Sequence, residues 1–313
     1  MEPPTPTLKA TTPDDLFTVV PYMLGFHPIE SLVALQIDGK RVGAVARVDI
    51  DGPPELVARA LGPLFERFAS SDFILVAYCR DRHHGEAVLD AAESRLGRHR
   101  VVDTLMTDGV RGWSLFYDDD GWVLPPPDEL LCAEAVFAGL APMDDRLAIA
   151  RLVDGPAPDR LPTLRELFEA AADAQSSSTE PWMARLDRLL DIGLADAGAL
   201  AEVDVAELAI MVARIEWRDH AWTRMTRIGA RAHKELWLRV VEITPDEWAV
   251  PVLCLLGFAS WLDGGGALVV SCSERAWQLD PGYTMLQLLD DINEHAIPPS
   301  VWDAMNQPQG EVA

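Results

Sequence analysis

LFTVVPYMLGFHPIESLVALQIDGKRVGAVARVDI, residues 16–50, is the stretch around which the N-terminal half of the chain is built. Its first part is an apolar segment of helical character that we expect to end at Gly25, because glycine is the usual residue just past a last helical turn. Leu32–Ile37 reads as a short apolar strand, and Asp38-Gly39 is a dipeptide typical of tight hairpin turns. The stretch therefore predicts a helix followed by a two-stranded hairpin that starts a sheet.

The next apolar run, FILVAYC at 73–79, fits a strand that is buried on both faces. A helix beginning at Pro53-Pro54 precedes it, and a second helix, about 85–96, leads to a further strand at 101–106. The resulting order of strand, helix, strand, helix and strand favours two right-handed crossovers. We therefore expect a mixed, mostly parallel sheet with FILVAYC in its interior.

One antiparallel edge strand is expected to complete this sheet. Arg111–Tyr117 is the predicted strand, because Trp113, Leu115 and Tyr117 alternate there with polar or smaller residues, and Asp118–Gly121 is the predicted turn that follows. Beyond the prolines at 125–127, no strand pattern recurs and apolar residues return at helical spacing. The predicted fold class is α+β or α/β, with an N-terminal mixed sheet flanked by helices and an all-α C-terminal domain.

A chain of 313 residues is long enough for two domains. We expect a flexible tail at 1–15, an α/β domain at 16–153, a linker with one helix at 154–179, and a helical domain at 180–313. Within the last domain, Leu256-Gly257, Gly264, Ala276 and Pro281 fall at the offsets of the tetratricopeptide repeat. Because a lone repeat cannot build a solenoid, the expectation is a single tetratricopeptide-like helical hairpin.

Charge and composition exclude several classes of protein. The formal net charge is −24, and no stripe of Lys and Arg is visible that could displace counterions from a nucleic acid. The same negative charge works against anionic membrane surfaces. Apolar residues make up 49% of the chain, which is far too many for a disordered acidic protein. The sequence thus predicts a soluble acidic protein with no nucleic-acid partner and no membrane partner.

The cysteines and the N-terminal residues indicate the cellular compartment in which we expect the protein. Cys79, Cys132, Cys254 and Cys272 lie in apolar segments without CxxC spacing, as expected of reduced core thiols in the cytoplasm. Residues 1–15 have neither a basic nor an apolar region of the secretory type, so we expect no signal peptide. The longest apolar run, 248–262, is shorter than the roughly 20 residues of a membrane span and predicts a buried helix.

Four pieces of sequence together resemble the domain-of-unknown-function 4192 family. They are PYMLGFHPIESLV at 21–33, GAVARVDI at 43–50, RDHAWTRM at 218–225 and GGGALVVSCSERAWQLDPGYTMLQLL at 264–289. The resemblance covers about 16–299. It implies kinship of fold and a cytoplasmic location, and it implies no mechanism, because the family carries no agreed activity.

The candidate ligand-binding residues lie at two strand ends. Arg80, Asp81 and His83 follow FILVAYC, and ligands of open α/β sheets bind beyond the carboxyl ends of strands. Arg47 and Asp49 share one face of the return strand, about 6.6 Å apart along it. They could clamp a polar ligand, but a structural ion pair is the favoured interpretation. The alternative interpretation of the 80–84 loop is a solvated polar turn that binds no ligand.

Other groups of residues in the sequence are weaker candidates for a functional site. His27 and Ser31 lack the GxSxG context of a nucleophile, and His83, His84 and Glu86 do not make a metal site at neighbouring helical positions. Arg218 and Trp222 are four residues apart, so a guanidinium could stack on an indole there. No cofactor motif, metal motif or catalytic residue is identified.

Two functions remain open from the sequence. We favour a non-catalytic binding or adaptor protein whose helical domain contacts a protein partner, because no catalytic grouping is visible. The alternative is an enzyme or small-ligand binder with its site at the 80–84 loop, although fold alone licenses no chemistry. The sequence leaves the question of enzymatic activity undecided.

Overall fold

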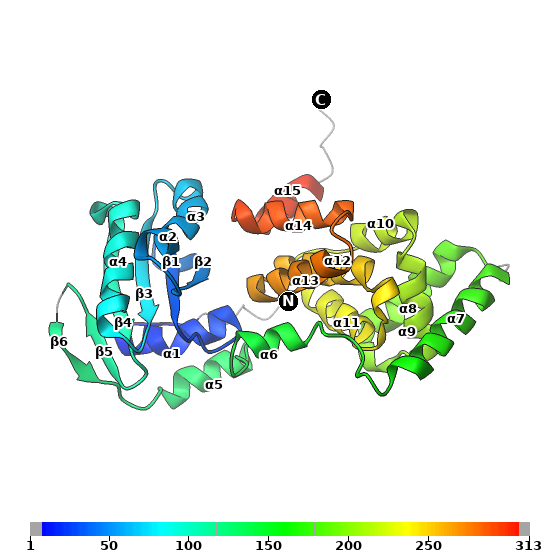
Figure 1. The fold of residues 1–313 in the computed structure, drawn as a ribbon, viewed down its shortest axis with the longest axis horizontal. Coiled ribbons are helices and arrows are strands. Elements are labelled where there is room, and N and C mark those ends of the chain that lie inside the picture. Colours follow the sequence, from blue (N-terminus) through cyan, green and yellow to red (C-terminus); the bar gives the residue numbers. More distant parts are fainter. Residues whose placement is uncertain (1–7, 117, 178–179, 307–313) are drawn as a thin grey trace, which may run out of the picture. The chain divides into compact units, whose positions relative to one another are not determined.

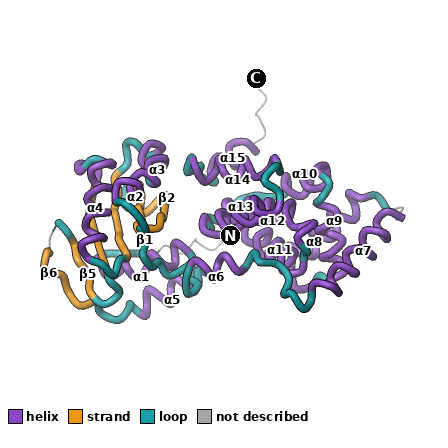
Figure 2. Tube along the Cα trace, viewed as in Figure 1, coloured by secondary structure: helices purple, strands orange, loops and turns teal. Residues whose placement is uncertain are grey.

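The structure is a computed structural model that describes residues 8–116, 118–177 and 180–306. Contacts within the chain divide it into two compact units, Met1–Arg146 and Leu147–Ala313. Figure 2 shows that the strands belong to the first unit, whereas the described part of the second is built of helices and loops. The class is α+β, as the sequence patterns predict.

The first unit contains one six-stranded sheet with helices on its two faces (Figure 1). Its elements are α1 (Pro13–Leu24), β1 (Ser31–Asp38), β2 (Arg41–Asp49), α2 (Pro54–Ala60), α3 (Gly62–Arg67), β3 (Asp72–Tyr78), α4 (Arg82–Leu96), the 3-10 turn η1 (Arg98–Arg100), β4 (Val101–Thr107), β5 (Arg111–Ser114), β6 (Asp118–Val123) and α5 (Glu129–Phe137).

The strands lie in the order β2-β1-β3-β4-β5-β6, so FILVAYC does form an interior strand. The side chains of Phe73, Leu75, Val76 and Ala77 have no exposed surface. However, β3 is parallel only to β4 and antiparallel to β1, and the remaining pairs are also antiparallel. The prediction of a mostly parallel sheet is therefore wrong.

The reason lies in the different burial of the two hairpin strands. Every residue from Ser31 to Gln36 in β1 is buried, whereas no residue of β2 is fully buried. The more apolar strand takes the interior position, and β2, with its charged residues, becomes the edge. The connection from β2 to β3 therefore passes across β1, and β3 pairs with β1 in the register Ser31 to Tyr78.

The strand predicted at 111–117 is shorter than expected and does not lie at the edge of the sheet, and the predicted Asp118–Gly121 turn is wrong. β5 ends at Ser114, and Asp118–Val123 forms the additional strand β6, which pairs antiparallel with β5. Tyr117 lies outside the described residues. Trp122 at the end of β6 donates a 2.7 Å hydrogen bond to Asp14 Oδ1 in α1.

The helix α1 begins with a reciprocal capping arrangement. The Asp15 backbone N–H donates to Thr12 Oγ1 (3.2 Å), and the Thr12 N–H donates to Asp15 Oδ2 (3.0 Å). These bonds help to lower the pKa of Asp15, with the backbone N–H of Thr11 as the largest cause. The helix ends at Gly25, as predicted, in the left-handed conformation with φ of +79°. Its apolar side packs on a cluster in the sheet that includes Val33, Leu35, Val76 and Leu105.

The second unit is a helical array. Its elements are α6 (Arg146–Arg151), whose first residue ends the first unit, α7 (Leu161–Ser177), α8 (Trp182–Ala195), the 3-10 turn η2 (Ala197–Ala199), α9 (Glu202–Val212), α10 (Ile215–Thr223), α11 (Ala230–Ile243), α12 (Asp246–Leu262), α13 (Gly266–Leu279), α14 (Thr284–Glu294) and α15 (Ser300–Asn306).

The helix α12 is the core of this unit, since every residue from Ala249 to Leu262 is buried. It confirms the predicted buried helix at 248–262, and it packs most extensively on α13 and α11. The two predicted hairpin helices are therefore present, although their likeness to a tetratricopeptide repeat stays a prediction. Among the described residues, no helix combines the length and apolarity needed to cross a bilayer.

Candidate functional site

The predicted residues of β2 form an ion pair within the first unit. Arg47 Nη2 lies 2.7 Å from Asp49 Oδ1, and Arg47 Nε donates a 2.8 Å hydrogen bond to Ser31 Oγ in β1. The guanidinium also lies over the ring of Phe26, at 5.7 Å from its centroid. Asp49 Oδ2 is 3.5 Å from Arg146 Nη1. Arg47 thus links β2, β1 and the corner after α1.

The second group of predicted residues, Arg80, Asp81 and His83, lies in the loop after β3 and at the start of α4. Asp81 is the N-cap of α4, and its Oδ1 accepts hydrogen bonds from the backbone N–H groups of His83 (3.0 Å) and His84 (3.4 Å). A carboxylate therefore occupies the position at which a helix N-terminus would receive an anion. The side chains of Arg80, Asp81 and His83 are exposed.

Glu30 is the residue that brings these two groups together, and the sequence patterns do not single it out. Its Oε1 accepts from the Arg80 backbone N–H (3.1 Å), and its Oε2 lies 3.5 Å from Cys79 Sγ. It precedes Ser31, which binds Arg47, and it adopts an unusual φ of +42°. Burial, together with Glu30, raises the pKa of Cys79 to about 11, so that thiol is not an activated nucleophile.

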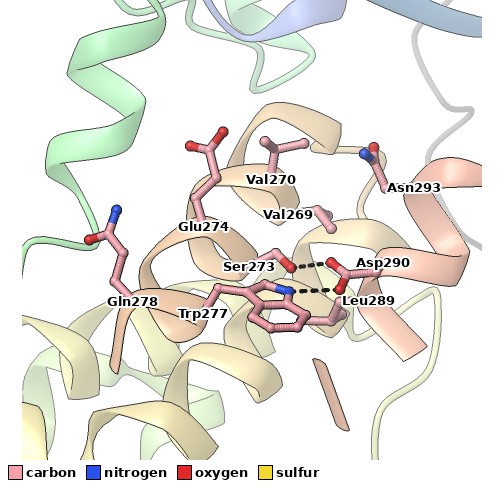
Figure 3. Close-up of a pocket in the computed structure, with 9 residues that line it drawn as sticks. All are labelled: Val269, Val270, Ser273, Glu274, Trp277, Gln278, Leu289, Asp290 and Asn293. Carbon is pink, nitrogen blue, oxygen red and sulfur yellow. Dashed lines mark hydrogen bonds between the residues drawn. The ribbon is translucent and has the colours of Figure 1, made fainter. Parts of the chain in front are cut away.

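A second region, which the sequence patterns do not identify as a site, lies between α13 and α14. A pocket of about 390 Å³ opens there (Figure 3). Its nine lining residues are Val269, Val270, Ser273, Glu274, Trp277 and Gln278 from α13, with Leu289, Asp290 and Asn293 from α14. The α13 residues recur at the spacing of one helix face. The only advance signal is Ser273 and Trp277, a hydroxyl and an indole one turn apart on a largely apolar helix.

Hydrogen bonds hold the Asp290 carboxylate in a defined orientation inside this pocket. Its Oδ1 accepts from Ser273 Oγ (2.6 Å), and its Oδ2 accepts from the Trp277 indole Nε1 (2.7 Å). Figure 3 shows both bonds running from α13 to the same side chain of α14. Val269 and Leu289 are almost fully buried, so the accessible apolar surface comes from the partly buried Val270 and from Trp277, 43% of which is exposed. The pocket therefore combines a fixed negative charge, an accessible aromatic ring and apolar surface.

The two late pieces of the family-like sequence meet in a cluster that positions α14. Arg218 is 6% exposed; its Nη1 donates to the Tyr283 hydroxyl (2.7 Å), and its Nε and Nη2 donate to Asp219 Oδ1. Its guanidinium lies over the Tyr283 ring, at 5.4 Å from the centroid, and not over Trp222, the stacking partner that the spacing of four residues allowed. Trp222 instead stacks on Trp302. Because Tyr283 is the residue just before α14, Arg218 fixes one wall of the pocket.

A further pocket of about 330 Å³ adjoins the first one and shares Glu274 and Gln278 of α13 with it. Its cation, Arg275, pairs with Asp246 at 2.7 Å, so this surface already has its own counterion. Within the described residues, no group of three His, Cys, Asp or Glu side chains is placed to hold a metal ion. The α13–α14 pocket is the better candidate for recognition of another molecule.

Comparison with known proteins adds the family. The family model described as Domain of unknown function (DUF4192) matches residues 13–300 of the 313-residue chain. No curated protein and no solved structure matches the chain. The match spans the sheet, the Arg218–Tyr283 cluster and both helices of the pocket, so the chain belongs to the DUF4192 family, whose function is unknown.

Proposed function

We propose that this protein is a non-catalytic binding or adaptor protein and that the α13–α14 pocket is its recognition site. The observation that carries the proposal is the Asp290 carboxylate, which the neutral donors Ser273 and Trp277 hold beside apolar surface. None of the nine lining residues is a histidine or a lysine, and the Ser273 hydroxyl donates to the Asp290 carboxylate, a weak base that the Trp277 indole also engages. The arrangement suits recognition better than turnover.

An enzyme or small-ligand binder with a site at the 80–84 loop is the second candidate. Its support is that Glu30 brings the end of β3 close to Ser31 and the Arg47–Asp49 pair. Two observations weaken it. Asp81 already fills the N-terminus of α4, and the Arg47 guanidinium is engaged by Asp49 and Ser31.

The proposed partner is a protein, and the proposed location is the cytoplasm. A net charge of −24 disfavours nucleic acid, because binding there depends on neutralising phosphates with Lys and Arg. The four cysteines are all free, as expected in a reducing compartment. We also propose that α12 and α13 form a tetratricopeptide-like hairpin. A Cβ placed on Gly257 would lie 3.3 Å from the Cβ of Cys272, which fits the close approach that the Leu-Gly position of the repeat requires.

A thermal-shift screen of the full chain tests the function. The panel holds nucleotides, sugars, organic acids, amines and short peptides, and the measurement is the rise in Tm on adding each compound. We expect hits whose effect is lost in Trp277→Ala and kept in an Arg80→Ala/Asp81→Ala double variant. Both variants alter exposed side chains, and each is compared with its own ligand-free Tm.

The reverse pattern would replace the proposal by the second candidate. If the hits survive Trp277→Ala and disappear in the Arg80→Ala/Asp81→Ala variant, the ligand site is the loop after β3. Turnover of a hit compound by the wild-type chain would contradict the non-catalytic role directly.

A further inference from the structure

Asp290 differs from other half-buried carboxylates of the helical unit in its partners. Glu207 and Asp204, at 21% and 31% side-chain exposure, both form ion pairs with Arg185 at 2.5 and 2.9 Å. Asp290 accepts its hydrogen bonds from the neutral hydroxyl of Ser273 and the neutral indole of Trp277, and within the described residues no cation pairs with it. A half-buried carboxylate is costly to leave without a counterion, so the missing positive charge is expected from a ligand.

The geometry leaves room for that charge. An ionised carboxylate offers about four lone-pair positions, and Ser273 and Trp277 use one on each oxygen of Asp290. The remaining positions can accept N–H donors from a guanidinium or an ammonium group. None of the nine lining residues is a Lys or an Arg.

Trp277 adds a second contact that is selective for a cation. Its Nε1 edge faces Asp290, and 43% of the residue is exposed (Figure 3). A cation near Asp290 could therefore also lie against the indole face, and tryptophan gives the strongest cation–π contact of the aromatic side chains. The partly buried side chain of Val270 offers apolar surface for the methylene stem that carries such a group.

From these contacts we propose that the α13–α14 pocket receives an arginine or lysine side chain from a segment of a basic protein partner. The proposal rests on the binding function above and names the class of ligand. A volume of about 390 Å³ is near the lower end for small-molecule sites and suits one long side chain. The exposed amides of Gln278 and Asn293 supply donors and acceptors that match a peptide backbone. The net charge of −24 favours encounter with a basic partner.

The test uses an N-acetylated, C-amidated heptapeptide with one central arginine in a Gly/Ser/Ala background. Calorimetry on the full chain measures its Kd, together with the Kd of the same peptide carrying citrulline, which keeps the shape and removes the charge. We expect the citrulline peptide to bind at least about tenfold more weakly. N-acetylagmatine, which carries the same guanidinium and no second positive charge, is expected to bind about threefold more weakly than the arginine peptide, because it lacks the backbone.

Two variants of equal charge locate the site. Asp290→Asn is expected to weaken the arginine peptide at least about tenfold, whereas Asp291→Asn, on the exposed neighbouring position of α14, leaves the Kd unchanged. If circular dichroism shows that Asp290→Asn is unfolded, Trp277→Leu serves instead and is expected to weaken binding about threefold by loss of the ring.

Three results would overturn the inference. Equal affinity for the arginine and citrulline peptides would show that the pocket does not recognise a positive charge. If N-acetylagmatine binds as tightly as the peptide, the ligand is a small guanidinium compound and not a protein segment. If Asp290→Asn and Asp291→Asn change the Kd of the arginine peptide equally, the peptide is attracted by the overall charge of the protein and not by Asp290. If in addition the thermal-shift hits are insensitive to Trp277→Ala, the proposed function fails as well; if they remain sensitive, only the ligand class is wrong.

Discussion

His233 in α11 is a buried titratable residue with an uneven set of hydrogen bonds. It is 2% exposed, its Nδ1 has no partner among the described residues, and the backbone of Arg224 bonds its ring. Burial lowers the pKa of His233 from 6.5 to about 4, because the charged imidazolium is poorly solvated in the core. The neutral ring is therefore the form that the folded state prefers.

This pKa makes the stability of the protein depend on pH. Between pH 6.5 and about pH 4 the unfolded state binds the extra proton, so the free energy of unfolding falls as the pH is lowered through this window. The loss from this one residue is about 3 kcal/mol. We expect His233→Gln to remove that part of the pH dependence in urea unfolding between pH 7 and pH 4.5. A variant with the same pH slope as wild type would show that His233 is readily protonated in the folded state.

Arg218 gives a second prediction at the scale of single residues. Its planar fork contacts Tyr283 and Asp219 at once, which a lysine cannot reproduce. Arg218→Lys should therefore lower the free energy of unfolding by about 2 kcal/mol, measured by urea titration. The matched control is Arg231→Lys, since Arg231 pairs with Glu235 at 58% exposure on each side and should change stability by less than about 0.5 kcal/mol. Equal effects of the two variants would contradict the role of Arg218.

The elements of the helical unit approach closely at Gly257 in α12. A Cβ there would lie 2.9 Å from Leu289 Cδ1 and 3.3 Å from Cys272 Cβ, whereas a Cβ on Gly266 in α13 would meet nothing within 4 Å. We expect Gly257→Ala to destabilise the protein by about 1 kcal/mol, since overpacking exceeds the gain in helix propensity. Gly266→Ala should be neutral or stabilising by up to about 1 kcal/mol. Thermal unfolding of the two variants compares them, and an equal gain in both would rule out tight packing of α12 at Gly257.

Much of the element order could be predicted from local patterns. The unbroken apolar run 73–79 gave an interior strand, the run 248–262 gave the buried α12, and Gly25 ended α1 as expected. The sheet direction could not be predicted in the same way, because it depends on whether β1 or β2 lies beside β3. A comparison of their side chains would have helped, since β1 is uniformly apolar over Leu32–Leu35 and β2 carries Arg41, Arg47 and Asp49.

The candidate site was less predictable than the fold for a physical reason. Arg218 and Tyr283 are 65 positions apart, and Ser273 and Asp290 are 17 apart, so their contacts depend on how helices pack and not on spacing within one helix. The Arg47–Asp49 pair, two positions apart on one strand face, was within reach of the sequence and is present. Whether that pair or the 80–84 loop binds a ligand stays a prediction.

At the scale of the whole molecule, the net charge of −24 should act on the rate and salt dependence of binding. Raising the ionic strength from about 0.1 M to 1 M shortens the Debye length from about 10 Å to 3 Å. We expect the association rate of the arginine heptapeptide to fall severalfold over this range, while the citrulline peptide changes little. Stopped-flow fluorescence with a labelled peptide measures both. A salt dependence shared by the two peptides would mean that the arginine charge is not what the protein senses.

The indole N–H signal of Trp277 reports most directly on whether a cation enters the α13–α14 pocket. It is assigned in the ¹H–¹⁵N spectrum of the full chain by its absence in Trp277→Phe, and the arginine heptapeptide is then titrated in. We predict that this signal shifts and saturates with the Kd found by calorimetry, while the buried indole of Trp237 in α11 does not move. Binding of the peptide with no change in the Trp277 signal would place the ligand elsewhere on the protein.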